Sequence, residues 1–75
     1  MQVRVKLMGA LKDKTPVDER LDLPAAATIE DALQSLEITA PQIQIVMVNG
    51  RPQPDRSQAL SPDDELTVLP PVGGG

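Results

Sequence analysis

The sequence predicts an α+β domain, a mixed sheet of four to five strands with one main helix packed on one face. Three observations lead to this prediction. Residues 2–7 alternate between polar and apolar side chains, one apolar stripe at helical spacing lies within residues 28–36, and two further strand-like runs occupy residues 43–48 and 65–69. Side chains alternate between faces along a strand but return to one face every three to four residues along a helix, so the two patterns are distinguishable.

The first two strands form a predicted hairpin. Residues 2–7 place their three apolar side chains on one face, as in a half-buried strand. The charged residues and proline of 12–16 break this alternation, and residues 21–23 resume it until Pro24 ends the strand. We therefore expect two strands joined by a loop.

A single helix follows. Thr28 can act as its N-cap, and Glu30 and Asp31 place negative charge at the positive end of the helix dipole. Pro41 prevents the helix from continuing far beyond its apolar stripe. The stripe has the spacing i, i+3, i+4 and i+7 and consists of Ile29, Ala32, Leu33 and Leu36.

The second half of the chain supplies the remaining strands. The β-branched run 43–48 indicates a central strand, and Asn49-Gly50 indicates a tight turn. Pro52 and Pro54 limit the next segment to a short edge strand, because proline cannot donate to a ladder. With a last strand at 65–69, this order fits a β-grasp layout with the first and last strands parallel at its centre.

Composition restricts the function. The 75 residues predict one domain, 1–72, and a flexible glycine tail, 73–75. The absence of Cys and His removes thiolate nucleophiles, zinc-type ligand sets and the usual general base, so we expect no metal site and no enzyme activity of the chain on its own. A net charge of −4 argues against nucleic acid as a partner. No apolar run is long enough to cross a membrane, and Met1 leads directly into a strand, so we expect a cytoplasmic protein.

The end of the sequence has the most unusual composition. Three glycines follow Pro70, Pro71 and Val72. Glycine lacks a Cβ, so such a segment can pass extended through a narrow channel and bring the carboxylate of Gly75 close to a nucleotide. Activation of that carboxylate needs no side-chain nucleophile, which fits a chain without Cys or His.

Three motifs carry a family resemblance. They are Val-Asn-Gly at 48–50, Leu-Ser-Pro-Asp-Asp-Glu-Leu at 60–66 and Leu-Pro-Pro-Val-Gly-Gly-Gly at 69–75. The chain resembles the MoaD/ThiS family of ubiquitin-like sulfur carriers over essentially its whole length, and within it most closely the small subunit of molybdopterin synthase. It departs from the common family pattern at Met8, where an aromatic is usual, at Asp63, where a turn glycine is usual, and at Gly73, which is often Ala, Ser or Thr.

The resemblance implies a chemistry. An E1-like adenylyltransferase would use ATP to adenylate the carboxylate of Gly75, and a sulfur donor would convert the acyl-adenylate into a thiocarboxylate. The tail would then enter the molybdopterin synthase large subunit, or another sulfur-accepting enzyme, and donate sulfur for molybdenum cofactor biosynthesis. The chain itself would bind no cofactor and would act as the sulfur-donating small subunit of a two-component sulfurtransferase.

The resemblance also implies a site. Gly73, Gly74 and Gly75 would enter the catalytic site of the partner, and the docking surface would consist of residues beside the tail, namely Met8, Pro52, Leu69, Pro70, Pro71 and Val72. Three other functions stay open on the sequence: a sulfur carrier for thiamine, cysteine or another metabolite, a ubiquitin-like modifier that forms isopeptide bonds, and a non-conjugating interaction domain with an inert tail.

Overall fold

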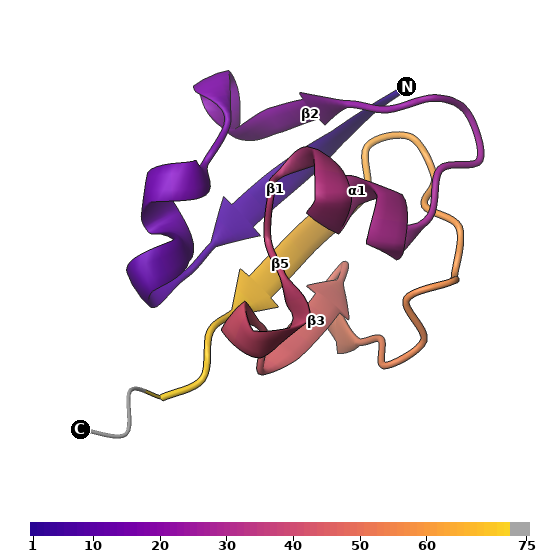
Figure 1. Ribbon diagram of the computed structural model, residues 1–75. Helices are drawn as coiled ribbons and strands as arrows, with labels where there is room; N and C mark the ends of the chain where they lie inside the picture. The colour runs from indigo at the N-terminus through magenta and orange to yellow at the C-terminus, as the bar shows by residue number, and fades with distance from the viewer. Residues whose placement is uncertain (73–75) are drawn as a thin grey trace.

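The computed structural model describes residues 1–72 and shows one sheet with one helix across it (Figure 1). The predicted glycine tail, 73–75, lies outside the described residues. The strands are β1 (Gln2–Leu7), β2 (Arg20–Asp22), β3 (Ile45–Val48), β4 (Arg51–Pro52) and β5 (Glu65–Leu69), and the helix is α1 (Ile29–Ser35). Three 3₁₀ helices, η1 (Gly9–Lys14), η2 (Val17–Glu19) and η3 (Ala40–Gln42), complete the described elements.

The sheet has the predicted β-grasp order. Its strands lie in the order β2-β1-β5-β3-β4. β1 and β5 are parallel, with Leu7 opposite Val68, while β2 and β3 run antiparallel to these two central strands. The prediction that the first and last strands pair in parallel at the centre is therefore confirmed.

Two predicted segments differ in detail. Residues 12–16, expected as a plain loop, belong largely to η1, whose one buried residue is Leu11. A 3₁₀ segment this short needs no repeating apolar stripe, so nothing in the pattern marks it. The strand expected over residues 43–48 begins only at Ile45, because Ile43 caps η3 and its N–H bonds the Ala40 carbonyl. This strand also lies one place from the sheet edge, and β5 occupies the centre.

The helix begins where the sequence predicts. The Thr28 hydroxyl accepts from the Asp31 N–H at 3.1 Å, and the Asp31 carboxylate accepts from the Thr28 N–H at 2.9 Å. This reciprocal capping box satisfies two backbone donors that a helix start leaves unpaired. The N–H groups of Ile29 and Glu30 donate to the carbonyls of residues 58 and 56, so the loop before β5 covers the rest of the helix start.

The core lies between α1 and the inner face of the sheet. β1 buries alternate residues, and all four residues of the predicted stripe are buried, three within α1 and Leu36 at its C-cap. The largest fully buried side chains are Val3, Val5, Ile29, Leu33, Leu66 and Val68, and no polar residue is buried among the described ones. Truncating a buried Leu or Ile to Ala in such a core costs about 2–5 kcal/mol, so α1 and the sheet depend on each other for stability.

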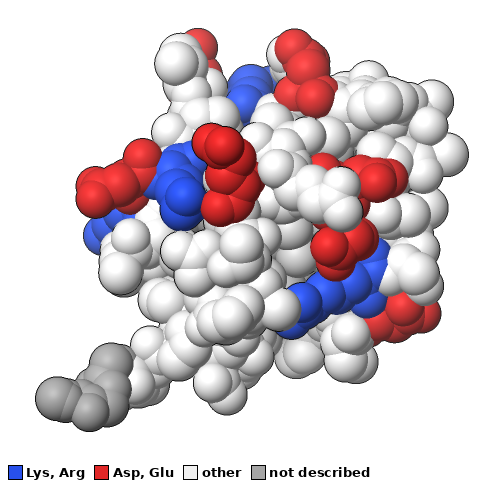
Figure 2. Space-filling view, viewed as in Figure 1, with Lys and Arg blue, Asp and Glu red and all other residues white. Residues whose placement is uncertain are grey.

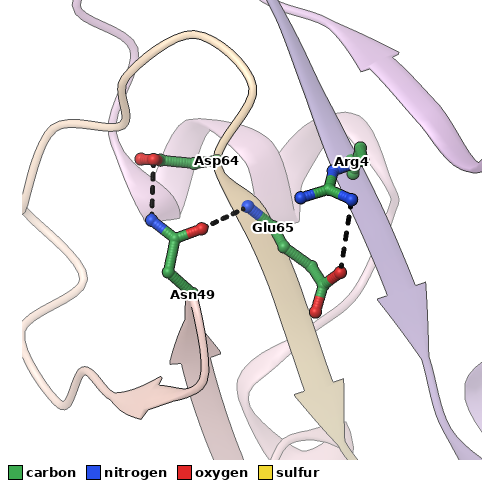
Figure 3. Close-up of polar contacts among 4 residues, drawn as sticks. All are labelled: Arg4, Asn49, Asp64 and Glu65. Carbon is green, nitrogen blue, oxygen red and sulfur yellow. Dashed lines mark hydrogen bonds and ion pairs between the residues drawn. The ribbon is translucent and has the colours of Figure 1, made fainter.

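A hydrogen-bonded clasp fixes the start of β5 (Figure 3). Asn49, at φ 53° in the tight turn after β3, donates through Nδ2 to Asp64 Oδ1 at 2.9 Å and accepts the Glu65 N–H at 2.9 Å. Its own N–H donates to the Glu65 carbonyl. The Glu65 carboxylate also lies 3.8 Å from the Arg4 guanidinium on β1. The strand that leads to the C-terminus is thus held in register at its beginning.

Candidate functional site

The C-terminal segment, residues 70–72, leaves the sheet at a fixed point. The Met8 N–H donates to the Val68 carbonyl at 3.1 Å, and on the other side the Gln44 N–H donates to the Leu69 carbonyl at 2.7 Å. Pro70 has no N–H, so the ladder cannot continue through it. Strand β5 therefore ends at Leu69, where the residues that adjoin β1 and β3 are still hydrogen-bonded to it.

Exposure rises along the C-terminal segment. Pro70 is half-buried and Pro71 is exposed, while Val72 is 93% exposed. The two prolines each fix φ near −65°, so the segment has fewer conformations than an ordinary terminus. Figure 1 shows it running beyond the end of β5 and away from the body of the domain. The predicted catalytic residues Gly73, Gly74 and Gly75 come after it and lie outside the described residues.

Next to this segment, the face of the sheet opposite α1 carries apolar side chains. Ile45 pairs with Leu69, and Met47 pairs with both Thr67 and Pro52 across the strands. Because Val46 and Val68 point into the core, their sequence neighbours point outward. We call the resulting set the open-face patch, and it consists of Ile45, Met47, Pro52 and Leu69.

The open-face patch contains two predicted residues and two that sequence reasoning missed. Leu69 and Met47 are half-buried, Pro52 is exposed and Ile45 is 42% exposed. The missed pair, Ile45 and Met47, lies in the β-branched run that suggests a strand buried on both faces. The sequence carries no signal that separates them from Val46, because residues 45–48 are all apolar and only the structure places Val46 in the core.

The predicted docking residue Met8 lies at the same end of the sheet. It is half-buried and immediately follows Leu7, whose register partner Val68 immediately precedes Leu69. The three predicted residues 70–72 continue from this point. The structure thus brings Met8, Leu69 and the C-terminal segment together, with Pro52 at the far side of the open-face patch. Their role in docking stays a prediction.

The surroundings of the C-terminal segment are uncharged on the face that Figure 2 displays. Lys, Arg, Asp and Glu lie elsewhere on that face, and the surface that leads to residue 72 is free of them. In the loop between β4 and β5, two hydrogen bonds lower the pKa of one carboxyl group. The Ser57 hydroxyl and then the Ser57 N–H donate to the Asp55 carboxylate, and these bonds hold the pKa of Asp55 below its ordinary value.

Two searches of residues 1–72 bear on the kinds of site that this part of the chain holds. No three His, Cys, Asp or Glu side chains among residues 1–72 gather closely enough to hold a metal ion. Within the same residues, no helix has both the length and the apolar character that a membrane crossing requires. The arrangement presents an exposed C-terminal segment beside the apolar side chains of the open-face patch.

A five-stranded mixed sheet with one helix, whose central strand leads into the C-terminal segment, defines a ubiquitin-like β-grasp protein. Residues 5–75 match the ThiS family, so the chain belongs to that family, whose members include the MoaD-type proteins of the predicted resemblance. It is accordingly of the sulfur-carrier or ubiquitin-like modifier type.

Solved structures share this fold. SAMP1 from Haloferax volcanii is 25% identical, with a TM-score of 0.76 and 100% of both chains covered. A Pyrococcus furiosus protein proposed to be subunit 1 of molybdopterin converting factor is 23% identical, with a TM-score of 0.76 over 96% of this chain and 99% of that one. A chain from the complex of subunits 1 and 2 of the Helicobacter pylori molybdopterin-converting factor is 21% identical, with a TM-score of 0.64 over 100% of both. No curated protein sequence matches the chain.

Proposed function

We propose that this protein is a sulfur carrier whose working group is the carboxylate of Gly75 and which donates sulfur for molybdopterin biosynthesis. The observation that carries the proposal is the end of β5. Two backbone hydrogen bonds, from Met8 and Gln44, fix the strand up to Leu69, and the prolines then direct an uncharged segment away from the domain. The family match continues through this segment to Gly75.

The chemistry is dictated by the groups that the chain lacks. A carboxylate is a poor nucleophile and a poor acyl donor until an activating group is attached. An E1-like adenylyltransferase would let the Gly75 carboxylate attack the α-phosphorus of ATP, with pyrophosphate as the leaving group. Hydrosulfide delivered by a sulfur donor would then attack the acyl carbon, and the bond from that carbon to AMP would break, which leaves a thiocarboxylate and free AMP. The domain contributes position, and the two partners contribute the catalytic groups and the nucleotide site.

Docking would use the open-face patch together with Met8. Apolar residues that a partner fully covers contribute most to binding, and Ile45 and Leu69 have the central positions for this role. A hollow of about 340 Å³ adjoins the patch and has Ile45, Pro52 and Arg56 in its lining, so a partner side chain can enter beside the patch. The Helicobacter pylori structure, a complex of subunits 1 and 2, supports a sulfur-accepting large subunit as one occupant.

Protein modification is the second candidate function. It is favoured by the likeness to SAMP1, a small archaeal modifier protein, over the full length of both chains. Activation of Gly75 would be the same, but the acyl group would pass to a lysine amine of a target protein. The two functions differ in what is transferred and to what: an acyl group to a lysine, or sulfur to a precursor of molybdopterin, thiamine, cysteine or another metabolite. The structure of the domain is the same for both.

One experiment tests both candidates. The protein is isolated from its native host under denaturing conditions and its intact mass is measured, together with the masses of any larger species that contain it. A carrier shows a free chain with one sulfur in place of one terminal oxygen. A modifier shows covalent adducts with other proteins. The protein could also show an unaltered carboxylate and no adducts in cells that are actively making molybdopterin. This result would favour an interaction domain with an inert tail.

A further inference from the structure

Gly9 lies against the first residue of the C-terminal segment. It begins η1, is separated from β1 by Met8 alone, and has a φ of +54°, a conformation that side chains disfavour. A Cβ at this position would lie 3.1 Å from Cγ and 3.7 Å from Cδ of Pro70. The Pro70 ring thus contacts the space that a side chain at residue 9 would occupy.

A second glycine shows that this contact is specific. Gly50, in the turn after β3, has a φ of +81°, and a Cβ there would meet nothing within 4 Å. Backbone conformation alone accounts for glycine at position 50. Gly9 has the same backbone requirement and also lies close to Pro70. Only Gly9 of these two glycines is therefore in contact with the C-terminal segment.

Three consecutive residues at the end of β5 are each held by a contact with the domain. The carbonyl of Val68 is held by Met8, the carbonyl of Leu69 is held by Gln44, and the ring of Pro70 packs on Gly9. Beyond Pro70 no described hydrogen bond attaches residues 71–72 to the domain. The ring restricts the φ of Pro70, and the following Pro71 restricts its ψ, so the orientation of the ring strongly influences the direction of the next residues.

We propose that Gly9 is a positioning residue, whose absent side chain seats the Pro70 ring and thereby sets the direction in which the C-terminal segment leaves the domain. Its effect on catalysis rests on the proposed activation of Gly75, whereas the seating itself does not. A change of direction at Pro70 changes where residues 71–72 leave the domain and so where a partner meets the residues that follow. Activation should therefore depend on a residue that touches neither the nucleotide nor the carboxylate.

Nuclear magnetic resonance tests the seating directly. The wild-type protein should show nuclear Overhauser effects between Gly9 Hα and the Pro70 ring protons. Gly9→Ala should shift the amide resonance of Val72, because the Pro70 ring has to move. Gly50→Ala is the matched control, since it introduces the same kind of backbone strain away from the segment, and it should leave Val72 unchanged. Absent Gly9–Pro70 effects, or equal Val72 shifts in the two variants, would overturn the proposal.

ATP–pyrophosphate exchange with the activating enzyme tests the consequence. Gly9→Ala should lower kcat about tenfold, because misplacing a reacting group by less than 1 Å already slows catalysis substantially. KM should stay within about twofold, because the open-face patch is untouched and uniform binding is retained. Gly50→Ala should leave both constants unchanged. Gly9→Asn, which tolerates this φ better but carries a Cβ, should repeat the loss of kcat if Gly9→Ala folds poorly.

A double-mutant cycle separates contact from strain. Pro70→Ala removes the Cγ atom that a side chain at residue 9 would meet. Gly9→Ala should then change kcat by less than about twofold in the Pro70→Ala background, since coupling is confined to groups in contact. Equal losses of kcat in both backgrounds, or no loss in either, would contradict the positioning role. If the wild-type protein supports no exchange, the proposed function is refuted. The contact between Gly9 and Pro70 would then be tested only by the shift of the Val72 amide resonance.

Discussion

Ile45 and Val46 are sequence neighbours on opposite faces of β3, and their substitution separates docking from folding. Ile45 is 42% exposed on the open-face patch, whereas Val46 is 5% exposed in the core. Ile45→Ala removes three carbon groups, each of which contributes about 0.8 kcal/mol when it is buried. Multiplying this sum by the exposed fraction of Ile45 gives a loss of roughly 1 kcal/mol in binding free energy. This corresponds to an approximately fivefold weaker Kd. Val46→Ala should cost about 2 kcal/mol of folding stability with little change in Kd.

The assay is titration calorimetry with the activating enzyme or the sulfur-accepting subunit, combined with thermal unfolding of each variant. Ile45→Glu should weaken binding by more than about tenfold, because an unpaired carboxylate would be buried in the interface. Its free energy of unfolding should change by less than about 1 kcal/mol, because the residue is near the surface. The reasoning is refuted if Ile45→Glu binds as the wild type does, or if Ile45→Ala destabilises the free domain as much as Val46→Ala.

Three further predictions concern the C-terminal residues, the clasp and the Asp55 carboxylate. One residue added after Gly75 should abolish ATP–pyrophosphate exchange, because it moves the carboxylate by about 3.3–3.6 Å. Gly74→Val should impair exchange, because a branched side chain restricts the backbone conformations of residue 74. Neither variant should change Tm. Undiminished exchange by the extended chain would exclude the carrier mechanism. Asn49→Ala should remove about 2 kcal/mol, from two hydrogen bonds, and lower Tm by roughly 8–16 °C, whereas Asn49→Gly, which relieves the positive φ, isolates the hydrogen-bond part. A Tm change below about 2 °C would show that the clasp does not stabilise the fold. The pKa of Asp55 is lowered on folding, so its stabilisation is present above the ordinary carboxyl pKa of about 3.9 and is lost as pH falls through the folded value. Wild type should therefore have a higher Tm than Asp55→Asn at pH 7 and an equal Tm once Asp55 is protonated, and a difference that persists in acid would contradict this reasoning.

The sequence predicted the parts of the fold in which a local pattern and the tertiary structure agree. Thr28 and the stripe after it specify the start, direction and buried face of α1, and all four stripe residues are buried. The alternation in residues 2–7 likewise gives the buried face of β1. Each of these patterns repeats within a few residues, so a single sequence is sufficient to detect it.

The features that the sequence did not reveal depend on distant contacts. Asp18 and Glu19 have positive φ values in η2, which no composition signal marks. The outward position of Ile45 is a result of the pairing of β3 with β5, and a β-branched run does not disclose which of its residues a sheet leaves uncovered. The contact between Gly9 and Pro70 exists only because β1 and β5 are parallel neighbours that end at the same side of the sheet.

The parallel pairing of β1 and β5 also has a mechanical consequence. The chain enters the sheet at the start of β1 and leaves it at the end of β5, so opposite forces on these two points act along the strands. Such a load is shared by all the hydrogen bonds between the two strands at once, instead of breaking them one after another. A pull on the C-terminal segment against the start of β1 therefore has to break the whole central ladder at once.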